Sequence, residues 1–283
     1  MAAKKSKPNN EHILDTETGE HVKESSGDSG ACLTRHVAPC TEGDSCSHRW
    51  QAYRHATESD ATKNMYNYPA YKKVCDDQAA KGNKTAVQKE QWDLGKSSTI
   101  YRHDKKVGAT VQKTVPNFLS RADVPYPHNG HHMIPNSVLN GCLLSAAKND
   151  MSLHYLARVG LLQAKYNLND KLNMIILPMR RYVSVAIGLP RHISGIDRLP
   201  GDSPEKRNHT GYNRRVRVQV EPIIEKYASQ IDTKQHNVTL PAMTKEDLER
   251  ISKTIFASLQ GWNAMGRALN AMPASLFVPK ASS

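Results

Sequence analysis

The stretch PHNGHHMIPNSVLN, residues 127–140, contains two adjacent histidines, His131 and His132, followed by a segment that favours a helix. With 13 histidines among 283 residues, chance alone gives about 0.6 such pairs. The pair by itself therefore establishes no chemistry. Its meaning depends on the segments around it and on those further along the chain.

The segments that follow the pair predict two helices and a buried strand. Asn136 or Ser137 can act as the N-cap of a helix that runs through residue 147. Residues 152–166 have the amphipathic spacing of a second helix. The short apolar run LNMIILP, residues 172–178, ends in proline and is typical of a buried strand.

Two more helices are expected towards the C-terminus, and an extended segment precedes the histidine pair. Residues 204–231 should contain a helix that could kink at Pro222, and a further helix should start with Thr244 as its N-cap. Residues 99–115 alternate enough for a strand pair or an extended linker. We therefore expect an α+β fold that is mainly helical.

Composition divides the chain into three regions. Residues 1–30 are rich in Lys, Asn, Glu and Ser and predict a disordered tail. Residues 31–116 predict a helical N-terminal region of unknown role, with two or three short helices over 48–95. Residues 117–283, which include the histidine pair, form the expected second domain.

The chain carries a formal net charge of +12, which favours a polyanionic partner over a merely solvated surface. Its most apolar run is interrupted by Pro178, Arg180 and Arg181, so no membrane span is expected. The charged N-terminus has no apolar core of the kind that a secretory signal peptide needs.

Cysteines concentrate in one short segment. Cys32, Cys40 and Cys46 lie near His36 and His48, which makes a zinc site conceivable. The spacing matches no common zinc finger, and a disulfide or free buried thiols explain the cluster equally well. The sequence leaves these alternatives open.

Three short motifs follow one another in the second half of the chain: GHHMIP at 130–135, LNMIILP at 172–178 and NHTGYNRRV at 208–216. Together they resemble the AHH and GHH branch of the HNH/endonuclease VII superfamily, the His-Me finger nucleases. The resemblance covers roughly residues 120–230. It implies a small ββα core that holds one divalent metal ion, and a nuclease domain within 117–283.

The resemblance assigns a role to each matching residue. His131 corresponds to a metal ligand, His132 to the general base, and Asn173 to the amide that orients an imidazole. His209 corresponds to a second ligand and Asn213 to a third. Adjacent residues on a strand point to opposite sides, and residues spaced i, i+4 share a helical face, so these assignments are sterically reasonable.

Other side chains compete for some of these roles. His192, in the segment between the last two motifs, is an alternative metal ligand. Asn167 and Asn169 are alternatives to Asn173 as the orienting amide. His128 is a weaker rival for a metal or substrate contact.

Basic residues cluster beside the third motif. Residues 171–226 contain eleven Lys and Arg against five Asp and Glu, a balance that suits a phosphate backbone. The expected substrate-binding residues are Arg214, Arg215 and Arg217.

The resemblance implies a metal-dependent endonuclease that hydrolyses phosphodiester bonds, with DNA as the expected substrate and RNA as a second choice. Its cofactor would be Mg²⁺, with Zn²⁺, Ni²⁺ or Mn²⁺ as alternatives. Domains of this type are toxins of bacterial polymorphic and type VI secretion systems. The resemblance thus implies a cognate immunity protein, secretion-system components as partners, and delivery from the producer cytoplasm into that of a target cell.

Two other classes of protein stay open. The first is a non-catalytic, basic nucleic-acid-binding protein, which would have no need of the three ordered motifs. The second is a zinc hydrolase of another kind, but the HExxH motif of many such enzymes is absent from the sequence.

Overall fold

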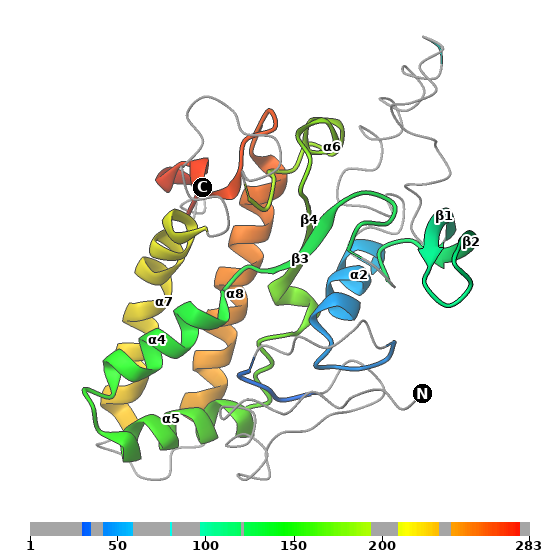
Figure 1. The fold of residues 1–283 in the computed structure, drawn as a ribbon. Coiled ribbons are helices and arrows are strands. Elements are labelled where there is room, and N and C mark those ends of the chain that lie inside the picture. Colours follow the sequence, from blue (N-terminus) through cyan, green and yellow to red (C-terminus); the bar gives the residue numbers. More distant parts are fainter. Residues whose placement is uncertain are drawn as a thin grey trace. The chain divides into compact units, whose positions relative to one another are not determined.

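The structure is a computed structural model that describes residues 30–34, 42–58, 80, 97–119, 122–193, 209–231 and 239–277 (Figure 1). Within these ranges it contains six helices and two small antiparallel two-stranded sheets, so the expected mainly helical α+β class is confirmed. Residues 1–29 of the tail expected over 1–30, Cys40, and nearly all of 59–95 within the helical segment expected over 48–95 lie outside the described residues.

The histidine pair ends a short strand. Strand β3 (His128–His132) pairs with β4 (Met174–Pro178), which confirms the buried strand expected at LNMIILP. Every residue of β4 is buried. Beyond the end of β4, the main-chain N–H of Met179 donates to the carbonyl of Pro127 over 2.8 Å. This bond holds the start of β3 beside the end of its partner strand.

Two helices follow β3, as expected. They are α4 (Asn136–Ala146) and α5 (Met151–Gln163), and the side chain of Asp150 caps α5 by accepting from two main-chain N–H groups of its first turn. The predicted side-chain cap of α4 is wrong. Its N-cap residue is Pro135, which makes no side-chain cap bond.

The side chain of Asn136 is used elsewhere. Its Nδ2 donates to the carbonyl of Leu33 over 3.2 Å, and so it joins α4 to the segment at 30–34. The amide of Asn136 therefore makes a tertiary hydrogen bond instead of capping the helix.

The two longest described helices are α7 (Thr210–Ile231) and α8 (Thr239–Gly261). Pro222 lies inside α7, which continues past it. The expected start of α8 at Thr244 is wrong, because this residue lies within the helix and its hydroxyl donates to the carbonyl of Leu240. A threonine that bonds back to the preceding turn belongs to the body of a helix.

The remaining elements are short. Residues 99–115 fall in an antiparallel hairpin, which confirms the strand-pair alternative, and Gly108 supplies a positive φ of 65° at its turn. The hairpin strands are β1 (Ser97–Asp104) and β2 (Ala109–Pro116). The other helical elements are α2 (His48–Glu58), α6 (Arg181–Ile187) and the 3₁₀ turns η2 (Lys171–Asn173), η3 (Leu269–Ala271) and η4 (Ala274–Phe277).

The chain divides into two compact units, and each combines segments from both sides of residue 117. Unit 1 comprises Met1–Gln51, His132–Met174 and Asn213–Thr254. Unit 2 comprises Ala52–His131, Ile175–Tyr212 and Ile255–Ser283. The expected division between a helical region over 31–116 and a nuclease domain over 117–283 stays a prediction.

A glycine permits one close helix contact inside unit 1. A Cβ on Gly160 of α5 would lie 2.1 Å from the hydroxyl oxygen of Tyr227 on α7. That hydroxyl donates to the carbonyl of Ala157 over 3.2 Å. The two helices approach closely because α5 has no side chain at this point.

None of the helices in the described ranges combines the length and apolar character needed to cross a membrane.

Candidate metal centre

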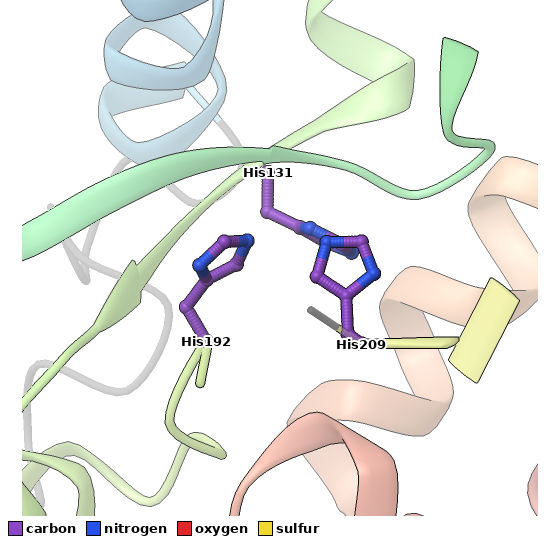
Figure 2. A group of neighbouring side chains, drawn as sticks. All are labelled: His131, His192 and His209. Carbon is purple, nitrogen blue, oxygen red and sulfur yellow. The ribbon is translucent and has the colours of Figure 1, made fainter. Parts of the chain in front are cut away.

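Three imidazoles meet in unit 2. The group consists of His131, His192 and His209, and the nitrogen atoms that could act as ligands all lie within 4.8 Å of one another. Ring centres are 4.8 Å apart for His131 and His209, and 5.0 Å apart for the other two pairs. Figure 2 shows the rings turned towards a common space from three separate segments of the chain.

His131 enters the group from strand β3. It is almost fully buried, and the ring of Tyr212 packs edge-on against it at 4.9 Å between ring centres. Tyr212 is itself completely buried, and burial holds the pKa of its hydroxyl well above the ordinary value. This tyrosine therefore supports the imidazole as a neutral packing partner.

His192 is anchored by main-chain hydrogen bonds, although it lies in a connection after α6. Its N–H donates to the carbonyl of Pro178 over 2.9 Å, which ties it to the end of β4. The residue before it, Arg191, exchanges main-chain hydrogen bonds with Arg267 and Leu269. Both residues are thus bonded to other segments of unit 2, and these bonds fix the main chain that carries the imidazole of His192.

Arg191 adds a side-chain anchor at the same place. It is 0% exposed, and its Nε donates to the carbonyl of Gly266 over 2.6 Å. A buried guanidinium is costly to desolvate unless it is hydrogen-bonded. We therefore assign Arg191 a positioning role for the backbone that carries His192.

His209 lies immediately before the first residue of α7, Thr210. The expected i, i+4 pairing of His209 with Asn213 on one helical face therefore begins one residue ahead of the helix. Near this end of α7 the side chain of Asn270 accepts a hydrogen bond from the N–H of Tyr212 over 3.2 Å. Asn270 thus fixes the helix start that follows His209.

The donor set fits a transition-metal ion better than Mg²⁺. Neutral imidazole nitrogens suit Zn²⁺, Ni²⁺, Cu²⁺ and Fe²⁺, whereas Mg²⁺ prefers oxygen ligands. At Zn–N distances near 2.1 Å, ligand nitrogens of a tetrahedral site are roughly 3.4 Å apart. Binding would thus draw the three rings somewhat closer together than the 4.8 Å limit observed here.

A metal ion held by these three histidines would keep an open coordination position. Catalytic zinc sites characteristically have three protein ligands and an open position for water or substrate. No carboxylate joins the three-histidine group among the residues described, so a bound ion would keep its full charge. Asn213 is half-buried at the start of α7, and its place in the ligand set stays a prediction.

The second histidine of the pair belongs to unit 1 and has a different environment. His132 is 6% exposed, and its Nε2 is 3.0 Å from Oδ1 of Asn169. The ring of His48, at the start of α2, lies 5.9 Å away at 31°. The amide that contacts this imidazole is therefore Asn169, which the sequence offered only as an alternative.

Asn173, the favoured orienting residue, holds main chain instead. Its Oδ1 accepts from the N–H of Ile134 at 2.7 Å and from the hydroxyl of Ser252 at 2.8 Å. Its Nδ2 donates to the carbonyls of Ile134 and Leu168. The amide thus fixes the chain directly after the histidine pair, and this is the positioning role that the structure supports.

The predicted substrate-binding arginines lie on α7 in unit 1. Arg214 and Arg217 are exposed and Arg215 is half-buried. Arg217 makes a two-nitrogen contact with one carboxylate oxygen of Glu221, at 2.7 and 3.0 Å, and this hydrogen bond raises the pKa of its guanidinium. The charge of Arg217 is thus partly compensated, whereas Arg214 takes part in none of the ion pairs between described residues.

The remaining candidates have structural roles in the described residues. His128 is buried, donates from Nδ1 to the carbonyl of Tyr126, and packs against Phe118, outside the three-histidine group. Cys32 and Cys46 are buried free thiols, which removes a disulfide between these two. Among the described residues the only metal-ligand group is the three-histidine group.

No family model, curated protein or solved structure matches the chain.

Proposed function

We propose that this protein is a metal-dependent phosphodiesterase that cleaves nucleic acid internally, with DNA as the first substrate to test and RNA as the second. The observation that carries the proposal is the convergence of His131, His192 and His209 in one unit. This set of three imidazoles comes from three separate segments of the chain. It matches the ligand number of an open catalytic metal site.

The proposed ligands are these three histidines, and the proposed ion is Zn²⁺ or Ni²⁺, with Mn²⁺ next. This replaces Mg²⁺ as the first choice, because nitrogen ligands disfavour a small hard cation. The ion would act as a Lewis acid that polarises the phosphodiester and stabilises charge on the leaving oxygen. Asn213 or water would occupy a further position.

His132 is the proposed general base, and it follows the ligand His131 directly in the chain. A neutral imidazole can take a proton from water near neutral pH without a large change in pKa. The hydrogen bond that its Nε2 makes to Oδ1 of Asn169 holds the ring in one orientation. Fixed orientation of the base contributes to the rate by keeping the reacting groups in position.

The proposed nucleic-acid contacts come from α7 and from the overall charge. The net charge of +12 favours binding to a polyanion at physiological salt. Arg214 is the strongest individual candidate, since it is exposed and forms no ion pair within the described part of the chain, whereas Arg217 is held by Glu221.

A basic binding module without catalysis is the second candidate. The charge supports it as well as it supports a nuclease. The three-histidine group favours the nuclease, because binding to phosphates requires no convergent set of neutral imidazoles.

The biological part of the proposal is an antibacterial effector, delivered into a target cell and neutralised in its producer by an immunity protein. It rests on the family resemblance of the three motifs. Its test is expression in the cytoplasm of a susceptible bacterium. We expect growth arrest with the wild-type chain and normal growth with His209→Ala or with a co-expressed cognate immunity protein.

The decisive experiment is cleavage of supercoiled plasmid by purified full-length protein. The protein is stripped with EDTA and then supplied with Zn²⁺, Ni²⁺, Mn²⁺ or Mg²⁺ in separate reactions. We expect nicking and linearisation with a transition metal and none with EDTA. Intact DNA and intact RNA under every metal condition, despite bound metal, would reject the nuclease and favour the binding module.

A further inference from the structure

We infer that the N-terminal segment around residues 30–34 fixes the protonation pattern of His132 through Asn169, so that Nε2 carries the proton and Nδ1 is the basic nitrogen. The inference rests on the proposed function for its catalytic consequence, but its structural content stands independently. All the residues involved belong to unit 1.

The first step concerns the orientation of the Asn169 side chain. Its Nδ2 is 2.9 Å from the main-chain carbonyl oxygen of Thr34. A carbonyl oxygen can only accept hydrogen bonds, so the amide must present its NH₂ group to Thr34. The opposite end of the amide, the oxygen Oδ1, then faces His132. Asn169 and Thr34 are both almost completely buried, so water does not compete for these groups.

The second step concerns the imidazole. Nε2 of His132 lies 3.0 Å from Oδ1 of Asn169. Because an amide oxygen cannot donate, the hydrogen of this bond must belong to Nε2. A neutral imidazole carries one N–H, and its second nitrogen then has the lone pair. The general base proposed above is therefore Nδ1.

The third step concerns the rigidity of the relay. The N–H of Asn169 donates to Oδ1 of Asn167 at 2.9 Å, and Nδ2 of Asn167 donates to the carbonyl of Ser45 at 2.8 Å. In the N-terminal segment, Cys32 exchanges main-chain hydrogen bonds with Tyr166 and Leu168. The loop that carries Asn167 and Asn169 is thus bound to the N-terminal segment at several points. Asn169 is a positioning residue, and Thr34 supplies the acceptor that decides which way its amide points.

This gives the N-terminal segment a function. Residues 31–34 belong to the region to which the sequence assigned no role. Without the carbonyl of Thr34, the amide of Asn169 could rotate and present its NH₂ group to the imidazole, which would select the opposite tautomer. The segment therefore completes the environment of the base and does not serve only as an attachment to the nuclease region.

The test is ¹⁵N NMR of histidine-labelled full-length protein without added metal, at about pH 8, where an ordinary imidazole is neutral. Two-bond nitrogen–proton correlations distinguish the two neutral tautomers. We expect the Nε2–H pattern for His132, assigned through its loss in His132→Gln. His128 is an internal reference with the opposite pattern, because its Nδ1 donates to the carbonyl of Tyr126. An Nδ1–H pattern for His132 in the wild type overturns the inference without any further variant.

Asn169→Ala and Asn167→Ala form a matched pair. Both remove a buried amide from the same loop, but only Asn169 contacts the imidazole. We expect Asn169→Ala to lose the fixed Nε2–H pattern and Asn167→Ala to keep it. Asn169→Asp, which retains an acceptor for Nε2–H, should restore the pattern. An equal loss in both alanine variants would indicate general loosening and would overturn the specific role.

Activity provides a separate readout. In the plasmid assay we expect Asn169→Ala to lower kcat by roughly 10–100-fold with little change in KM, the usual effect of losing a partner that orients a functional imidazole. An unchanged kcat would overturn the catalytic consequence and leave the nuclease proposal intact. Conversely, an inactive wild type that shows the expected tautomer would reject the nuclease proposal and leave the relay intact.

Discussion

The imidazoles of His192 and His209 meet with their ring centres 5.0 Å apart, and His131 lies against both. His192 is anchored to the end of β4, and His209 precedes the start of α7. A metal site assembled from three elements depends on each one, and so each histidine can be tested separately.

We expect His131→Ala, His192→Ala and His209→Ala each to weaken binding of Zn²⁺ or Ni²⁺. The loss should exceed the roughly 10–100-fold that removal of an outer partner costs, because a direct ligand is removed. Isothermal titration calorimetry measures the effect. His103→Ala, a change at an exposed histidine of β1, is the control and should bind as the wild type does. Undiminished binding in His192→Ala would exclude it from the ligand set and favour Asn213.

His132→Ala should separate binding from catalysis. Because the imidazole is the proposed base, its removal should lower the cleavage rate by about 10²–10⁴-fold. Metal affinity should stay within a few-fold of the wild type, since His132 is not one of the three ligands. Single-turnover cleavage and calorimetry on the same preparation measure the two effects. A variant that cleaves DNA at the wild-type rate would show that another group is the base.

Asn173→Ala should lower the stability of unit 1, because the side chain of Asn173 holds main chain and makes no hydrogen bond to the imidazole of His132. The change leaves the N–H of Ile134 and the carbonyls of Ile134 and Leu168 without this partner. We expect a loss of about 2–4 kcal/mol in the free energy of unfolding, since each buried unsatisfied group costs about 1–3 kcal/mol. Ser252→Ala removes one hydroxyl donor, which lies within hydrogen-bond distance of Asn173 Oδ1 and of the carbonyl of Leu248, and should cost about 1 kcal/mol. Urea unfolding measures both, and equal values would contradict a dominant role for Asn173.

Cys142 should be unreactive in the folded protein. Burial raises the pKa of its thiol from the ordinary 9.0 to about 11, so very little thiolate is present at pH 8. Iodoacetamide should modify it only after denaturation, as measured by mass spectrometry of peptides. The sign of the linked stability follows: the folded protein holds this proton more tightly, so the contribution is complete below pH 9 and is lost as the pH rises towards 11. Rapid native alkylation would contradict the buried position.

Arg214→Gln and Arg217→Gln test the nucleic-acid surface as a pair on one helix. Each arginine that neutralises a phosphate should reduce the salt slope of binding by about 1. We expect this reduction for Arg214→Gln and a smaller one for Arg217→Gln, because Glu221 already holds that guanidinium. Fluorescence anisotropy over a range of salt concentrations measures the slopes. Identical slopes for wild type and Arg214→Gln would remove this residue from the interface.

The local pattern of the sequence predicted the secondary structure well. The helices expected through residue 147, over 152–166 and within 204–231 correspond to α4, α5 and α7, and the proline-terminated apolar run predicted β4. Helix starts were less predictable. Asn136 had the right side chain for a cap, but Leu33, distant in sequence, took its hydrogen bond. Thr244 likewise resembled a cap, and the helix extends back to Thr239.

The candidate site was predicted in part. The sequence by itself predicted that a buried strand and an arginine-rich helix follow the pair His131 and His132. Only the tertiary structure brought His192 to His131 and His209, because its position depends on main-chain bonds to Pro178 and on the buried Arg191. Only the tertiary structure selected Asn169 over Asn173, because Thr34 orients one amide and Ile134 occupies the other. Periodicity reports on neighbours within a few residues, whereas hydrogen bonds between distant segments are decided by how the chain packs.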